Sequence, residues 1–313
     1  MYHALTGTEL PDNKNREGAP VIGLLQRFAR AALVASSCAA IVWMIGWPPA
    51  PALGQDPTER ARDADDTEKA IERYRQMLKE DPWSNPALLD ADRGEILWTT
   101  PRGPRNASLE QCDLGKGPGQ VDGAFAELPR YFADAERVMD VETRLLWCME
   151  KLQGFNRADL VKRPHPSGGQ PVKELGAIAT YVASKSNGLT FSAKLDHPKE
   201  KETVALGVAL FVRRSGTHDF ACSTCHAEPG RRIRLQGLPH LASAEEARKV
   251  IGEWPAYRVS STHVMTMQHR LYDCYWQMRI PELEMGSDVS VALIAYLAKM
   301  AEGGEISAPS IKR

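Results

Sequence analysis

The chain has 313 residues, in which 39 basic and 40 acidic side chains nearly cancel to a formal net charge of -1. This balance excludes the strongly basic composition that is typical of nucleic-acid-binding proteins. Hydrophobic residues make up 43% of the chain, so it is expected to be globular and long enough for two domains of ordinary size.

Residues 1–54 predict an export signal. Arg27 and Arg30 precede an apolar run over residues 31–47, and small residues and prolines follow it as far as Gly54. This is the order of charge, apolar core and cleavage region in secretory signals. The run of about 17 residues is at the lower limit for a membrane span, and its proline-rich end favours cleavage over an uncleaved anchor. We therefore expect a mature protein in the bacterial periplasm, released from the membrane.

Residues 55–80 are charged and poor in large apolar side chains, which predicts a solvated leader. Beyond it, four landmarks occur twice in the same order: a glycine with a following aromatic residue, a cysteine, an Arg-x-x-x-Cys pair and an amphipathic helix. Each landmark alone is ordinary core periodicity, but four in one order predict a tandem duplication. The first copy has Gly94, Trp98, Cys112, Arg144, Cys148 and residues 177–183; the second has Gly207, Phe211, Cys225, Arg270, Cys274 and residues 292–298.

The motif Cys222-Ser223-Thr224-Cys225-His226 lies in the second copy and is the most specific signal in the chain. Cys-x-x-Cys-His attaches c-type haem: Cys222 and Cys225 form thioethers, and His226 becomes an axial ligand of the iron. A redox pair or half of a zinc site is the alternative. A zinc site needs a second pair of ligands, and the sequence has no second Cys-x-x-Cys. The sequence thus predicts one covalently bound haem c.

We predict a mainly α fold of two tandem class I cytochrome c-like domains, the first without haem. Each domain is expected to have an opening helix, a haem-binding turn, a long loop-rich segment and a closing helix. Gly207 in the second opening helix is expected to let the closing helix approach closely. The predicted boundaries are a haem-free domain at 81–188, an exposed linker at 189–201, a haem-binding domain at 202–304 and a tail at 305–313.

The first copy has lost the residues that attach haem. Leu109 stands in place of the first motif cysteine and Asp113 in place of the histidine. Cys112 is left with Cys148, and two cysteines in an exported protein predict a disulfide. Closing a loop of about 36 residues would stabilise the fold by about 3 to 4 kcal/mol in the chain-entropy model, which would offset the missing haem.

Cys274 is the cysteine that remains when two are bound to haem and two are paired. Its place in the repeat is on the distal side of the haem, and the flanking Arg270 and Arg279 would favour a thiolate. The alternative is a buried, inert cysteine, with another residue as the sixth iron ligand. Methionine is the usual ligand in electron carriers. The competing candidates are Met265, Met267, Met278, Met285, His240, His263 and His269.

The chain resembles SoxA, the family of catalytic subunits of the SoxAX cytochromes that initiate thiosulfate oxidation. The resemblance extends over residues 83–303, and its most specific parts are residues 220–226, 254–258 and 268–274, with Arg279. It is similar to the form whose first domain keeps a disulfide in place of haem.

The resemblance implies a set of site residues. His226 and Cys274 would be the axial ligands of the iron, with Cys274 often carried as a persulfide. Arg270 would lie beside the ligand sulfur and help to bind the anionic substrate, and Arg279 and Arg258 are further possible substrate-binding residues.

The resemblance also implies an activity and its partners. The chain would be an L-cysteine S-thiosulfotransferase subunit that joins thiosulfate to a cysteine of SoxY in the SoxYZ carrier. Two electrons would pass to SoxX, a small cytochrome c with which it would form a heterodimer.

Two other functions stay open at the level of sequence. One is a non-catalytic electron-transfer cytochrome, in which Cys274 is inert and a methionine binds the iron. The other is a thiosulfate dehydrogenase that forms tetrathionate. Relatives of that kind normally keep haem in both domains, so Asp113 counts against it.

Overall fold

The computed structural model describes residues 80–161, 173–233 and 236–312, together with 66, 69–70, 72–74 and 76–77. The predicted export signal and most of the predicted leader lie outside the described residues. All the described residues belong to one structural unit. Within these ranges, none of the helices combines the length and apolar character that crossing a bilayer needs.

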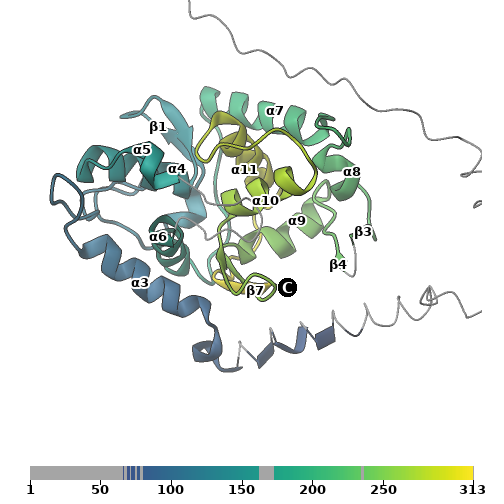
Figure 1. The fold of residues 1–313 in the computed structure, drawn as a ribbon, viewed down its shortest axis with the longest axis horizontal. Coiled ribbons are helices and arrows are strands. Elements are labelled where there is room, and N and C mark those ends of the chain that lie inside the picture. The colour runs from purple at the N-terminus through teal and green to yellow at the C-terminus, as the bar shows by residue number, and fades with distance from the viewer. Residues whose placement is uncertain are drawn as a thin grey trace, which may run out of the picture. The chain divides into compact units, whose positions relative to one another are not determined.

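The first half of the described chain, residues 81–188, is mainly helical (Figure 1). Its strands β1 and β2 form an antiparallel hairpin in which Tyr131 lies opposite Val138. In chain order its elements are η1 (Pro82–Ser84), α3 (Ala87–Thr99), η2 (Phe125–Glu127), β1 (Arg130–Phe132), β2 (Arg137–Met139), α4 (Val141–Cys148), the π-helix η3 (Met149–Gln153), α5 (Arg157–Val161) and α6 (Lys173–Ser184).

The second half, residues 189–312, has a similar content. Strands β5 and β6 form an antiparallel hairpin, and β7 adds to β5 in parallel, with Tyr257 opposite Ile311. Its elements are α7 (Pro198–Val212), α8 (Cys222–His226), β3 (Arg232–Ile233), β4 (Gln236–Gly237), α9 (Ala244–Val250), η4 (Ile251–Glu253), β5 (Ala256–Arg258), β6 (His263–Met265), α10 (Met267–Gln277), α11 (Asp288–Met300) and β7 (Ser310–Lys312).

The same series of elements runs through both halves: an opening helix, a hairpin, a cysteine-bearing helix and a closing helix. In the first half these are α3, β1–β2, α4 and α6; in the second they are α7, β5–β6, α10 and α11. The predicted mainly α fold is confirmed. The boundaries of two separate domains stay a prediction.

The opening and closing helices of each half cross closely (Figure 1). A Cβ added to Gly207 would lie 2.1 Å from the carbonyl oxygen of Ala292, so the predicted close approach at this glycine is confirmed. A Cβ added to Gly94 would lie 2.1 Å from the carbonyl oxygen of Ala177. Since no side chain fits at either crossing, both glycines are needed for the approach of the helices.

Side-chain caps start the helices that position the candidate site. Asp140 accepts a hydrogen bond from the third residue of α4, and Thr266 does the same at the start of α10. Ser287 caps α11 in the same way. Such caps satisfy backbone N–H groups that the first turn of a helix leaves without partners.

The segment predicted as an exposed linker, residues 189–201, is partly buried. Phe191, Ala193 and Leu195 are each at most 6% exposed, and the backbone at Phe191 pairs with that of Gly304. The alternating apolar residues place one face of an extended segment on the core, while the polar side chains of the other face are exposed. The predicted tail likewise lies on the core, where it forms β7.

The two halves are interlocked through their hairpins. Strands β1 and β2 contact α7, while β6 contacts α3 and α6. The ring of Tyr131 stacks on His197 with centroids 4.0 Å apart, and the Tyr131 N–H donates to Glu200 at 2.6 Å. Arg137 donates to Asp288 of α11 at 2.8 Å. Each half therefore helps to position the other.

Candidate functional site

A cavity of about 400 Å³ lies in the second half, within the range of sites that hold small molecules and cofactors. It brings together most of the residues that the sequence predicted. The aromatic rings of Phe211 and Tyr296, packed 4.7 Å apart at the crossing of α7 and α11, form part of its lining. The predicted site residues that line it are Cys222, Cys225, His226, Arg258, Arg270 and Cys274.

The short helix α8 carries the attachment motif. The backbone N–H of Ala221 donates to the Thr224 hydroxyl at 3.0 Å, which closes the turn at its start. Cys222 and Cys225 are three residues apart in the helix, so their side chains lie on one face. The turn thus offers both sulfurs, followed by the imidazole of His226, to the same cavity.

The imidazole of His226 is held in one tautomer. Its Nδ1 lies 2.8 Å from the carbonyl oxygen of Pro239. Because a carbonyl oxygen only accepts, Nδ1 carries the proton and Nε2 is left as the ligand atom. Burial also lowers the pKa of His226, since the charged imidazolium is poorly solvated there. A neutral imidazole with an oriented ring is what a metal ligand requires.

A sulfur and two guanidinium groups also line the cavity. They belong to Cys274, Arg270 and Arg258, which we call the distal wall. The neighbouring Cys274 is the main cause of the raised pKa of Arg270, which also donates to Asp273 at 2.7 Å. Burial, with the adjacent Arg270, lowers the pKa of Arg258 to about 10. Burial raises the pKa of Cys222 to about 12, and Cys274, which lines the same cavity, adds to that shift.

Three sulfur side chains that were candidates for the sixth ligand line the cavity: Cys274, Met267 and Met278. Among the described cysteines, Cys222, Cys225 and Cys274 form no disulfide. The other candidates do not line the cavity; two are buried methionines, and His263 and His269 stack on each other with centroids 5.7 Å apart. These five candidates are Met265, Met285, His240, His263 and His269.

The two further arginines differ in their placement. Arg258 lines the cavity, and its buried Nε has no hydrogen-bond partner among the described residues, so it suits an anionic group in the cavity. Arg279 is exposed, stacks on Trp276 with its guanidinium 4.7 Å from the ring, and is not part of the lining. A role for Arg279 in substrate binding stays a prediction.

In the first half, the place of the attachment motif is filled by protein. Cys112 and Cys148 form the predicted disulfide, with their Cα atoms 5.7 Å apart. Leu109 is fully buried in the core around it. The Asp113 carboxylate accepts from the backbone N–H groups of two glycines, at 2.6 and 2.8 Å, and thereby closes a turn. The absence of the Cys-x-x-Cys-His motif there is thus matched by a filled core.

Some contacts that shape this site could not be predicted from the side chains in the sequence. The partner of His226 is the backbone carbonyl of Pro239, which any residue provides. Gln268 was part of a family motif but had no assigned role, although it is 1% exposed and hydrogen-bonded to the first half. Contacts of these kinds depend on the tertiary arrangement.

The residues present fit haem c. Two cysteine sulfurs lie on one face of a turn, a neutral histidine keeps Nε2 as its ligand atom, and a mainly apolar cavity adjoins them. Such a turn, fold and cavity define a c-type cytochrome. The family model described as "SoxA/TsdA, cytochrome c domain" matches residues 93–191, which belong almost entirely to the half without the attachment motif.

The chain belongs to the SoxA family. It is 47% identical to the L-cysteine S-thiosulfotransferase subunit SoxA of Hydrogenophilus thermoluteolus over 84% of this chain and 93% of that protein. It is 34% identical to a protein of the same name from Hydrogenobacter thermophilus, over 78% of this chain and 88% of that protein. In fold it is similar to the crystal structure of SoxXA from P. pantotrophus, with a TM-score of 0.63 and 23% identity over 77% of this chain and 84% of that chain.

Proposed function

We propose that the chain is the catalytic haem c subunit that joins thiosulfate to a cysteine of SoxY in the SoxYZ carrier. Its relatives at 47% and 34% identity bear the name L-cysteine S-thiosulfotransferase subunit SoxA. The similar solved structure is a SoxXA complex, which supports SoxX as the partner that receives the electrons. We place the mature protein in the periplasm, with residues 1–54 as its export signal and two domains at 81–188 and 202–304.

The observation that carries this proposal is the composition of one cavity. The attachment motif on α8 and the distal wall, with a cysteine sulfur and two guanidinium groups, line the same space. An electron carrier needs no cluster of cations around its ligand. Guanidinium groups bind sulfonate-like oxygens, and a cysteine sulfur takes part in sulfur–sulfur exchange, so a site that conjugates thiosulfate uses both.

Each site residue has a proposed role. One haem c would be held covalently by Cys222 and Cys225, and His226 and Cys274 would bind its iron. When bound, the haem supplies a one-electron acceptor beside Cys274. Arg270, and with it Arg258, binds the sulfonate-like oxygens of thiosulfate through charge-assisted hydrogen bonds, which are strong in a partly buried site.

The overall reaction balances as an oxidative coupling. The carrier thiol loses its proton, a sulfur–sulfur bond forms between its sulfur and the outer sulfur of thiosulfate, and one proton and two electrons leave. If thiosulfate is first joined to Cys274, the carrier thiolate attacks the outer sulfur of the thiosulfate group and Cys274 leaves as a thiolate, as in thiol–disulfide exchange. SoxX is the proposed acceptor of the electrons.

The test is the electron paramagnetic resonance spectrum of the oxidised, haem-loaded protein beside Cys274→Met. We expect a low-spin thiolate signature that disappears in the variant, together with loss of carrier conjugation. Met278→Leu is the matched control, because it removes another sulfur from the same cavity, and it should keep the parent spectrum.

Two outcomes would replace the proposal. A parent spectrum of His/Met type, unchanged in Cys274→Met, would make the protein an electron-transfer cytochrome. Formation of tetrathionate from thiosulfate at full rate without any carrier protein would make it a thiosulfate dehydrogenase.

A further inference from the structure

Gln268 lies in the first turn of α10, the helix that also carries Arg270 and Cys274. It is 1% exposed and does not line the haem cavity. Burying an amide costs free energy unless its polar atoms are hydrogen-bonded, so the side chain of Gln268 is expected to have hydrogen-bond partners.

The side chain of Gln268 joins three segments. Its Nε2 donates to the Asp140 carboxylate at 2.8 and 2.9 Å and lies 2.9 Å from the hydroxyl of Thr143, both at the start of α4. Its Oε1 accepts from the backbone N–H of Gly286 at 2.7 Å, in the loop before α11. Both the donor and the acceptor end of the amide are therefore satisfied.

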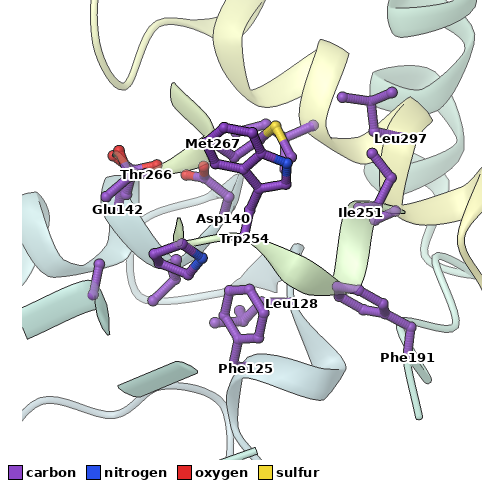
Figure 2. A pocket seen from close by; sticks show the side chains of 15 residues that line it. Phe125, Leu128, Asp140, Glu142, Phe191, Ile251, Trp254, Thr266, Met267 and Leu297 are labelled. Atoms are coloured by element: carbon purple, nitrogen blue, oxygen red, sulfur yellow. Dashed lines mark hydrogen bonds between the residues drawn. The ribbon is translucent and has the colours of Figure 1, made fainter. Parts of the chain in front are cut away.

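The backbone at the start of α10 is held by a second carboxylate of α4. Glu142 accepts from the N–H of Gln268 at 2.9 Å and from the hydroxyl of Thr266, the N-cap of α10, at 2.5 Å. The first turn of a helix has unpaired N–H groups and a partial positive charge, both of which favour a carboxylate. Figure 2 shows Glu142 and Asp140 close to Thr266, on one side of a second cavity of about 40 Å³.

Helix α4 is itself anchored in the first half. Its last residue, Cys148, forms the disulfide with Cys112. Arg144 is 2% exposed, donates to the Asp134 carboxylate at 2.8 and 2.9 Å, and has its guanidinium 4.1 Å from the centre of the Phe132 ring. Helix α4, which carries the carboxylates that contact α10, is therefore fixed in position within the first half.

We propose that Asp140, Glu142 and Gln268, which we name the carboxylate clasp, set the orientation of α10 and thereby aim Cys274 and Arg270 into the haem cavity. This inference rests on the proposed function, and the three are positioning residues that touch neither haem nor substrate. It gives the haem-free half a task in catalysis, because α4 belongs to that half. The half without haem would then position α10, the helix that carries the proposed iron ligand Cys274.

The test uses the haem-loaded protein and three readouts: the low-spin electron paramagnetic resonance signal, kcat and KM for carrier conjugation, and the denaturation midpoint. Gln268→Glu places a third carboxylate against Asp140. We expect a broadened or split low-spin signal and a fall in kcat of about tenfold or more, with a smaller change in KM. Gln268→Met, neutral and similar in size, should act in the same direction.

A reversed pair tests the contact directly. In Asp140→Asn combined with Gln268→Glu, the new amide can donate to the new carboxylate and still cap α4, so the parent signal and most of kcat should return. The matched control is Gln153→Glu, a fully buried glutamine of the first half that donates to the Ala107 carbonyl. It should lower the denaturation midpoint and keep the parent spectrum.

The clasp is overturned if both Gln268 variants fold with the parent spectrum and kcat, or if the reversed pair behaves no better than Gln268→Glu. The parent itself reports on the proposed function. A parent without a thiolate signature overturns that function, whereas a parent with the signature and unaffected Gln268 variants overturns the clasp alone.

Discussion

Helices α4 and α10 occupy the same place in the two halves and both carry Arg-x-x-x-Cys, yet their side chains serve different ends. Arg144 is enclosed between Phe132 and Trp147 and paired with Asp134, and Cys148 is consumed in a disulfide. In α10 the equivalent Arg270 and Cys274 both face a cavity.

The same contrast holds at the start of each half's loop region. Asp113 closes a turn through two backbone N–H groups, whereas His226, at the matching place, offers Nε2 to the cavity. The helix crossings at Gly94 and Gly207 are nevertheless alike. The scaffold thus does not depend on which cofactor-binding residues it carries, since a disulfide and packed side chains can fill the same volume.

The largest effect is expected from removing the attachment cysteines. Cys222→Ala with Cys225→Ala should abolish covalent haem, because both thioethers come from this motif. The measurement is a haem stain of the denatured protein after electrophoresis. Stained protein would show that haem is attached elsewhere.

The matching change in the first half should act on stability instead. Cys112→Ala with Cys148→Ala should keep covalent haem but lose about 3 to 4 kcal/mol of unfolding free energy, as expected for a loop of 36 residues. Denaturant titration checks this, and an unchanged midpoint would contradict it.

The two arginines provide the second test. Arg270→Met should lower kcat/KM for thiosulfate by about 100-fold, or about 2.7 kcal/mol, because this guanidinium lines the cavity and is the proposed partner of the thiosulfate oxygens. Arg144→Met should cost about 2 kcal/mol of stability through its lost buried hydrogen bonds, with at least tenfold less effect on kcat/KM. Steady-state kinetics and denaturant titration separate the two, and equal kinetic losses would refute the assignment.

Substitutions of the two crossing glycines, Gly94 and Gly207, should differ less in their effects than those of the two arginines. Gly94→Ala and Gly207→Ala should each cost about 1 to 3 kcal/mol, since the new methyl group meets backbone atoms that must move. The Gly207 variant should also shift the haem absorption bands, because Phe211 and Tyr296 of that crossing line the cavity. A shift of the bands in the Gly94 variant alone would contradict this.

The smallest effect concerns the caps of α4 and α10, which are Asp140 and Thr266. Burial raises the pKa of Asp140 above its ordinary 3.8. A raised pKa means a stabilising contribution that is complete below the unfolded pKa and lost as the pH rises through the folded one. The destabilisation caused by Asp140→Asn should therefore shrink between pH 4 and pH 7.

Unfolding free energies at several pH values measure this change. Ser287→Ala, which removes the non-titrating cap of α11, is the control and should cost the same at each pH. A destabilisation by Asp140→Asn that grows with pH would show that the carboxylate is favoured by folding.

Much of the fold followed from local patterns. Periodic apolar residues predicted α6 and α11, Gly207 predicted the close crossing of α7 and α11, and the repeat paired Cys112 with Cys148. The segment 189–201 was predicted as an exposed linker, whereas its alternating apolar residues Phe191, Ala193 and Leu195 are buried. Of the site, the motif cysteines and His226 were predicted to meet Cys274 and Arg270, and they line one cavity.

By itself, the sequence determined the chemistry that the chain carries: two sulfurs and an imidazole at fixed spacing, a spare cysteine and nearby arginines. Covalent spacing within one helical turn is local, so a motif can specify it. The tertiary structure decided which sulfurs reach the cavity, that Pro239 orients His226, and that Gln268 ties α10 to the other half. These are contacts between residues far apart in the chain, often through backbone atoms, and they exist only once both halves have packed together.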